Sequence, residues 1–153
     1  MNSVIYTKSF LENPEELFHI LLEKAKQWNK INYFKRHVCH YTFDIDELNA
    51  VLSNIETNYS RQVMGVFLNY YEDGNEYAPY HADKYNFDTL LMSLGATRTL
   101  RYKENKTKTN YDYVLNSGDL LFVPDEINKY YKHSLLKTKK VNEPRISILI
   151  FLQ

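Results

Sequence analysis

Near its carboxyl end the sequence reads Arg145-Ile146-Ser147-Ile148-Leu149-Ile150-Phe151. Successive side chains of a strand point to opposite faces of a sheet, so the three isoleucines share one face. That face is apolar and predicts a strand packed on a hydrophobic core. The opposite face carries Arg145, Ser147, Leu149 and Phe151. Arg145 is either a surface residue at the start of a strand or, on an inner face, a bidentate clamp for a carboxylate.

Upstream of this strand, short β-branched or aromatic runs recur from Gln62 onward. The predicted strands are Val63–Tyr71, Thr89–Leu94, Thr97–Lys103, Tyr111–Leu115, Asp119–Val123, Lys129–Ser134 and Arg145–Leu152. Gly74, Gly95 and Gly118 lie where these strands turn, and glycine tolerates the positive φ of tight turns. Such spacing is typical of a sandwich or barrel.

The first third of the chain has helical periodicity instead. One helix is predicted over Asn13–Trp28, with Asn13 as N-cap and Pro14 in the first turn. A second is predicted over about Ile45–Thr57, with Asp44 as candidate cap and one apolar stripe. The predicted fold class is therefore α+β, with a helical N-terminal third followed by a β-sandwich.

Composition limits the class of protein. The 153 residues suit a single domain, 1–153, and a 44% hydrophobic chain is not intrinsically disordered. A net charge of zero argues against a histone-like polyanion binder. The charge is uneven, because residues 1–80 hold 7 basic and 11 acidic side chains and residues 81–153 hold 12 and 8. A modest basic face in the second half remains compatible with this balance.

The sequence favours an intracellular, non-secreted protein. Cys39 is the single cysteine, which excludes an intramolecular disulfide and suits a reducing compartment. The start of the chain lacks the basic and apolar regions of a secretory signal, and no apolar run reaches the ~18 residues of a membrane span. We expect no membrane partner and a monomer.

His81-Ala82-Asp83 places an imidazole and a carboxylate on one face of an extended chain. Alone, this pattern more often marks a surface histidine with a capping aspartate. His133 lies in a predicted strand 52 residues later, and two histidines with one carboxylate from facing strands form the facial triad of a non-haem Fe(II) site. Asn69 and Tyr71 share a strand face before the turn at Asp73-Gly74, and both side chains can hydrogen-bond a polar ligand.

The order of these motifs resembles the AlkB family of Fe(II)- and 2-oxoglutarate-dependent dioxygenases, which oxidatively demethylate nucleic-acid bases. The motifs are Asn69-Tyr70-Tyr71-Glu72-Asp73-Gly74, His81-Ala82-Asp83, Ser93-Leu94-Gly95-Ala96-Thr97-Arg98, Gly118-Asp119-Leu120-Leu121, His133-Ser134 and Arg145. Their order and spacing match the family over about residues 62–153. The resemblance implies a double-stranded β-helix, or jelly-roll, core over residues 61–153. Residues 1–60 would form a helical extension packed on this core, with a short substrate lid.

The resemblance also implies the roles of the site residues. His81, Asp83 and His133 would ligate Fe(II), Arg145 would pair with the distal carboxylate of 2-oxoglutarate, and Asn69 and Tyr71 would hydrogen-bond this co-substrate. With O2, the enzyme would hydroxylate an N-methyl group of a base and release formaldehyde, with succinate and CO2 as co-products.

Substrate contacts are predicted from the same resemblance. Tyr41-Thr42-Phe43 resembles a stretch that, in duplex-active relatives, contributes an aromatic ring to the sandwich around the extruded base. Phe43 opposite His81 is therefore a candidate pair, and Tyr41 is a further candidate contact. Alternatively both rings belong to the core of an edge strand. The lysines and arginines of the second half would track phosphates of methylated DNA or RNA, or they are solvated strand edges.

Three departures from the family pattern keep alternatives open. Phe151 stands where the family has a second arginine, and Lys84-Tyr85-Asn86 follows the His-x-Asp motif in place of acidic residues. Tyr85 is a third candidate substrate contact, but it cannot act as a carboxylate toward a cationic base. The segment between Trp28 and Asn69 is short, which suggests an open site. The alternatives are an oxygenase that hydroxylates a protein or small molecule, and a non-catalytic nucleic-acid-binding relative.

Overall fold

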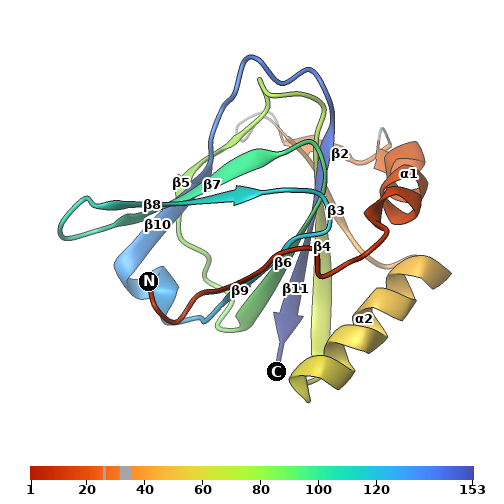
Figure 1. The fold of residues 1–153 in the computed structure, drawn as a ribbon, viewed down its shortest axis with the longest axis horizontal. Coiled ribbons are helices and arrows are strands. Elements are labelled where there is room, and N and C mark those ends of the chain that lie inside the picture. The colour runs from red at the N-terminus through yellow and green to blue at the C-terminus, as the bar shows by residue number, and fades with distance from the viewer. Residues whose placement is uncertain (26, 32–35) are drawn as a thin grey trace.

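The computed structural model of the protein describes residues 1–25, 27–31 and 36–153, and shows two antiparallel β-sheets that face each other (Figure 1). The larger sheet has the strand order β1 (Ile5–Thr7), β9 (Leu120–Val123), β6 (Asp88–Gly95), β11 (Arg145–Leu152), β4 (Val63–Tyr71), β3 (Arg36–His40) and β2 (Asn29–Ile31). The smaller has the order β5 (Ala78–His81), β10 (Tyr131–Leu135), β7 (Arg98–Glu104) and β8 (Asn110–Leu115). This is the predicted α+β jelly roll.

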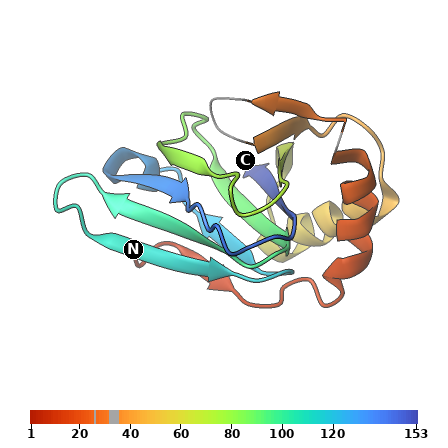
Figure 2. The ribbon, with the colours of Figure 1, turned by 90° about the horizontal axis from the view of Figure 1, so that it is seen from above.

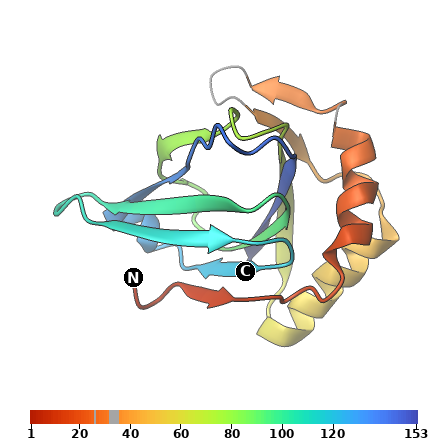
Figure 3. The same ribbon diagram turned by 45° about the horizontal axis from the view of Figure 1, so that its top comes forward.

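Two helices cover the outer face of the larger sheet, α1 (Pro14–Ala25) and α2 (Asp46–Tyr59) (Figures 2 and 3). Their apolar stripes, which include Leu21, Leu48 and Ile55, join the main hydrophobic core. The described residues contain no helix that is both long and apolar enough to cross a membrane.

The strand β11 lies at the centre of the larger sheet. It pairs along its whole length with β4 on one side and β6 on the other. Ile146, Ile148 and Ile150 are each 0% exposed and pack toward the helices, as their alternation predicts. The other face of β11, starting with the buried Arg145, therefore points into the space between the sheets.

The first third of the chain is less helical than predicted. It contributes β1, β2 and β3 to the larger sheet, and α1 ends at Ala25 rather than Trp28. These strands are specified by distant partners: β1 pairs with β9, and β3 pairs with β4. Asp44 is not the cap of α2, because Ile45 occupies that position and the Asp44 carboxylate instead accepts a hydrogen bond from Asn49.

Two further differences lie in the second half. The strand β5 was not predicted, and the segment predicted as one strand from Lys129 instead begins in a short helix, α3 (Ile127–Tyr130), before β10. Pro79 lies within β5, a residue that weakens any strand prediction. Both differences fall beside His81 and His133, so they affect how the site is built.

The buried isoleucine face generates the first prediction. Ile148→Ala should lower the free energy of unfolding by about 2–5 kcal/mol, because it removes buried methyl groups and leaves a cavity. Urea denaturation followed by circular dichroism measures this change. Ile5→Ala is the matched control, since Ile5 is 55% exposed and should change stability little. Equal losses in the two variants would contradict the assignment of the core face.

Candidate active site

A cavity of about 250 Å³ lies between the two sheets. Of the predicted site residues, it is lined by His81, Asp83, His133, Asn69, Tyr71, Arg145 and Tyr85. The fold therefore gathers side chains from β4, β5, β10, β11 and the segment after β5 around one space.

The two histidines come from neighbouring strands of the smaller sheet, not from facing strands as predicted. His81 on β5 is the direct antiparallel partner of His133 on β10. The register shifts between this pair and the next, Leu135 with Ala78, as at a β-bulge. Because of the extra residue on β5, both Ala78 and His81 line the cavity, although regular alternation would put them on opposite faces.

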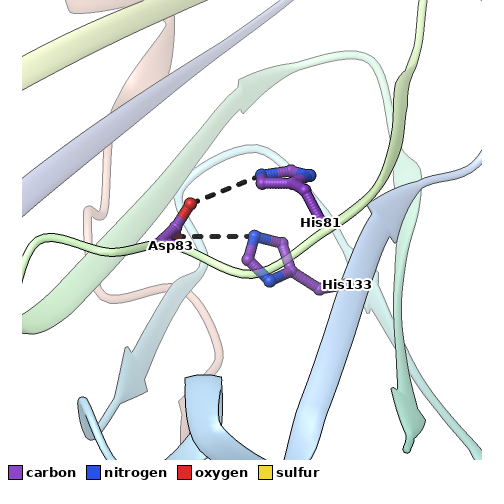
Figure 4. A group of neighbouring side chains, drawn as sticks. All are labelled: His81, Asp83 and His133. Atoms are coloured by element: carbon purple, nitrogen blue, oxygen red, sulfur yellow. Dashed lines mark ion pairs between the residues drawn. The ribbon is translucent and has the colours of Figure 1, made fainter.

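Asp83 lies just beyond the end of β5, where its backbone N–H donates to the Asn128 side chain (3.0 Å). Its carboxylate faces both imidazoles (Figure 4). Oδ1 is 3.4 Å from His81 Nε2, and Oδ2 is 3.5 Å from His133 Nε2. The three potential ligand atoms lie within 4.8 Å of one another. This is a set of two histidines and one carboxylate, which suits a non-haem Fe(II) ion.

The protonation states also suit a metal. His81 Nδ1 lies 2.7 Å from the Pro79 carbonyl oxygen, a contact that holds the proton on Nδ1 and leaves the lone pair on Nε2. Burial lowers the pKa of His133 to about 4, so this ring is neutral at physiological pH. Burial alone would raise the pKa of Asp83, but its contacts with the two imidazoles and the positive charge of Arg36 outweigh burial and lower the pKa. Neutral imidazoles and an ionised carboxylate are the forms that bind metals.

Arg145 fits an anion that the chain itself does not supply. Its side chain is 1% exposed, and Nε donates to Ser93 Oγ (2.9 Å). Nη2 is buried without a hydrogen-bond partner in the described part of the chain. Burial lowers the pKa of Arg145 to about 10, which still leaves it charged at neutral pH. A buried guanidinium that lines a cavity and has an unused donor is suited to a ligand carboxylate.

Asn69 and Tyr71 lie beside Arg145 on the cavity side of β4. Asn69 donates from Nδ2 to Ser147 Oγ (3.3 Å) and accepts at Oδ1 from Arg36 Nε (3.0 Å). The ring of Tyr71 has the guanidinium carbons of Arg98 and Arg145 at 5.6 Å each. Both side chains are thus held in place by neighbours before any ligand binds.

The three predicted substrate contacts are not brought together. Tyr85 lines the cavity, is 47% exposed, and lies 4.8 Å from the Phe151 ring and 6.2 Å from the Phe67 ring between centroids. Tyr41 and Phe43 do not line it. They pack edge to face against each other and on the helix-side core, and the Tyr41 hydroxyl donates to Asn49 Oδ1 of α2 (2.7 Å). Tyr41 and Phe43 are thus half-buried against the core and apart from the cavity, and their role as substrate contacts stays a prediction.

Arg36 is a cavity residue that was not predicted. It lies on β3, lines the cavity and bonds Asn69. Nothing in its local sequence marks it as a site residue, because β3 itself was not predicted. Its position follows from the pairing of β3 with β4, which aligns Val38 with Asn69.

Comparison with known proteins agrees with this geometry. The sequence model described as the 2OG-Fe(II) oxygenase superfamily matches residues 6–150. An uncharacterized protein of Acanthamoeba polyphaga mimivirus is 31% identical over 84 residues, which are 52% of this chain and 44% of that protein. The match thus spans less than half of the viral protein.

Two solved structures share the fold. A prolyl-4-hydroxylase of Pseudomonas putida superposes with a TM-score of 0.71 at 11% identity, over 98% of this chain and 91% of that one. An oxidoreductase of the 2OG-Fe(II) oxygenase family from Burkholderia pseudomallei gives 0.67 at 9%, over 99% and 84%. At such identities the likeness concerns the fold alone.

The clustered ligands predict metal-dependent stability. Mn(II), an inert stand-in for Fe(II), should raise the melting temperature, because a ligand that binds the folded state stabilises it by about 2.7 kcal/mol at one hundred times its Kd. His133→Ala should abolish the rise, and His19→Ala, on the exposed face of α1, should preserve it. Differential scanning fluorimetry with and without EDTA measures both. A rise that survives His133→Ala would place the metal elsewhere.

Proposed function

The chain belongs to the 2OG-Fe(II) oxygenase superfamily, and from this premise we propose that it is a dioxygenase that oxidatively demethylates alkylated bases in DNA or RNA. Membership implies Fe(II), 2-oxoglutarate and O2, and indicates an oxidoreductase rather than a non-catalytic relative. The ligand geometry is consistent with this. The choice of a nucleic-acid base as substrate rests on the motif order described above and on the aromatic group at the cavity.

In this proposal each residue has one task. His81, Asp83 and His133 would hold the iron on one side of the cavity, and Arg145, Asn69 and Tyr71 would bind the 2-oxoglutarate. When bound, the iron and 2-oxoglutarate would supply the oxidation. In this reaction O2 is consumed, 2-oxoglutarate becomes succinate and CO2, and the substrate methyl group is hydroxylated. His133 and Arg145 are buried, so the metal and the co-substrate would be bound away from bulk water on that side of the cavity. The protein fixes the position of the methyl group relative to the iron.

The observation that carries the substrate proposal is the half-exposed Tyr85 at the same cavity as the metal ligands. Its ring lies against the rings of Phe67 and Phe151. The ring of Phe87 packs in turn against that of Phe151, with their centroids 6.0 Å apart. We call Phe67, Tyr85, Phe87 and Phe151 the aromatic cluster. A rigid aromatic surface beside the iron suits a flat group such as an extruded base, since every base has a π-face.

Basic residues offer a partial path for phosphates. Lys103 on β7 and Lys132 on β10 are direct strand partners, and Lys103 Nζ lies 4.6 Å from the ring of Tyr80, next to His81. Arg101, by contrast, is engaged by Asp112 through two hydrogen bonds of 2.6 and 2.8 Å. Lys103 and Lys132 are therefore the better candidates for contact with a nucleic-acid backbone.

A second candidate function is hydroxylation of a peptide. Among the described residues that line the cavity, Asp83 is the only carboxylate, so a cationic alkylated base would find no other negative partner. The fold is also shared with a protein described as a prolyl-4-hydroxylase. Both observations are compatible with a neutral substrate such as a prolyl side chain.

A turnover assay separates the two functions. With Fe(II), O2 and 2-oxoglutarate, succinate formation should rise when methylated oligonucleotides are added, with formaldehyde in equal amount. Asp83→Ala should abolish both products, whereas Asp46→Ala, exposed in the first turn of α2, should not. Mass spectrometry of the oligonucleotides and of proline-containing peptides identifies the product. Succinate without any demethylated base, and with a hydroxylated peptide, would contradict demethylation.

Tyr85 offers a separate test of substrate contact. Tyr85→Ala should lower kcat/KM for the methylated oligonucleotide about tenfold or more, because stacking of a base on an aromatic ring contributes about 1–3 kcal/mol. Tyr85→Phe keeps the ring and should retain most of the activity. The KM for 2-oxoglutarate should stay within about twofold in both variants, as steady-state kinetics can measure. Unchanged kcat/KM in Tyr85→Ala would remove Tyr85 from the substrate site.

A further inference from the structure

Arg36 brings a second guanidinium into the cavity, from the side opposite Arg145. Its strand, β3, is separated from β11 by β4, and adjacent strands lie about 4.8 Å apart. Val38, two residues along β3, is the partner of Asn69 and also lines the cavity, so Arg36 is on the cavity face of its strand. The two arginines therefore flank the same space from strands on either side of β4.

A row of polar side chains connects the two arginines along the floor of the cavity. Arg36 Nε donates to Asn69 Oδ1 (3.0 Å), and Asn69 Nδ2 donates to Ser147 Oγ (3.3 Å). Ser147 is the strand partner of Ser93, and Ser93 Oγ accepts from Arg145 Nε (2.9 Å). The guanidinium of Arg36 is thus fixed by Asn69 at one end of a polar floor that has Arg145 at the other.

Arg36 lies at the metal end of this floor. Arg36 donates to Asn69, and Phe67, two residues before Asn69 on the same face of β4, packs against the ring of Tyr85, which follows Asp83 by two residues (ring centroids 6.2 Å apart). Arg145 instead pairs with Tyr71 at the other end of β4, where it lies with Arg98 beside the Tyr71 ring. Arg36 therefore lies on the side of the metal ligands, and Arg145 lies at the far end of the cavity.

The two cations match a dicarboxylate. Among the described residues that line the cavity, Arg36 and Arg145 are the arginines, there is no lysine, and Asp83 is the only carboxylate. A carboxylate bound next to the metal must lie close to the negative charge of Asp83, and a nearby guanidinium offsets that repulsion. Arg36 is the arginine that the fold places there.

We propose that Arg36 binds the metal-side carboxylate of 2-oxoglutarate, while Arg145 binds the distal one. The proposal rests on the use of 2-oxoglutarate and is independent of the nucleic-acid substrate. It makes Arg36 a co-substrate-binding residue contributed by the N-terminal part of the chain, and its bond to Asn69 sets its position.

Three ligands test the proposal by binding alone. 2-Oxoglutarate carries both carboxylates, 2-oxopentanoate has a methyl group in place of the distal one, and levulinate has a methyl group in place of the metal-side one. Each is titrated by calorimetry into the full chain loaded with Mn(II) under argon, so no turnover occurs. Arg36→Gln should weaken 2-oxoglutarate and 2-oxopentanoate about tenfold or more and leave levulinate within about twofold, because a hydrogen bond to a charged group contributes that much. Arg145→Gln should weaken 2-oxoglutarate and levulinate instead.

The control variants separate binding from folding. Arg36→Lys keeps the charge and should recover part of the affinity for 2-oxopentanoate, and Arg101→Gln, at an exposed pair on β7, should bind all three ligands as the wild type does. Unchanged 2-oxoglutarate binding in Arg36→Gln would overturn the proposal. An equal loss for levulinate would also overturn it, because the arginine would then act only by shaping the site through Asn69. A wild-type protein that binds no 2-oxoglutarate would overturn the proposed dioxygenase function as well.

Discussion

The site depends first on the register between β5 and β10. Antiparallel pairing places His81 directly opposite His133, with ring centroids 4.2 Å apart. The register shift beyond this pair lets β5 present both Ala78 and His81 to the cavity, and the chain then turns so that Asp83 meets both imidazoles. A slip by one residue would move the ligands to the other face of the sheet. The metal centre is thus a consequence of strand pairing more than of the His-x-Asp motif itself.

The second constraint is the burial of charge between the sheets. Removing a guanidinium from water is costly unless its donors are used. Arg98 does not line the cavity. Its Nη1 and Nη2 donate to the backbone carbonyls of Asp73, Glu76 and Leu136, so it stabilises the loop that leads into β5, and only its Nε has no partner among the described residues. Arg145 is equally buried but lines the cavity, and its Nη2 has no partner among the described residues. The difference separates a structural arginine from one that is prepared for a ligand.

How far the sequence predicts this structure depends on how local each signal is. The alternation in β11 gave both the core face and the inward position of Arg145, and β4 was predicted at its observed limits, Val63–Tyr71. The short strands β1 and β3 and the strand β5 are held by distant partners, so no local pattern marks them. Arg36 was missed for that reason. Tyr41 and Phe43, assigned by resemblance to a base-binding stretch, are half-buried against the core and do not line the cavity. The motifs predicted the type of chemistry, and strand pairing determined which other side chains line the cavity.

The central claim is that one cavity holds a metal on His81, Asp83 and His133 and a dicarboxylate on the arginines opposite. A crystal structure of the protein grown without O2, with Mn(II) and N-oxalylglycine, an inert analogue of 2-oxoglutarate, tests it most directly. The account predicts one Mn(II) bound by Nε2 of both histidines and a carboxylate oxygen of Asp83, with the distal carboxylate of the analogue on Arg145. A metal bound by other residues, or an analogue whose distal carboxylate lies away from Arg145, would contradict it.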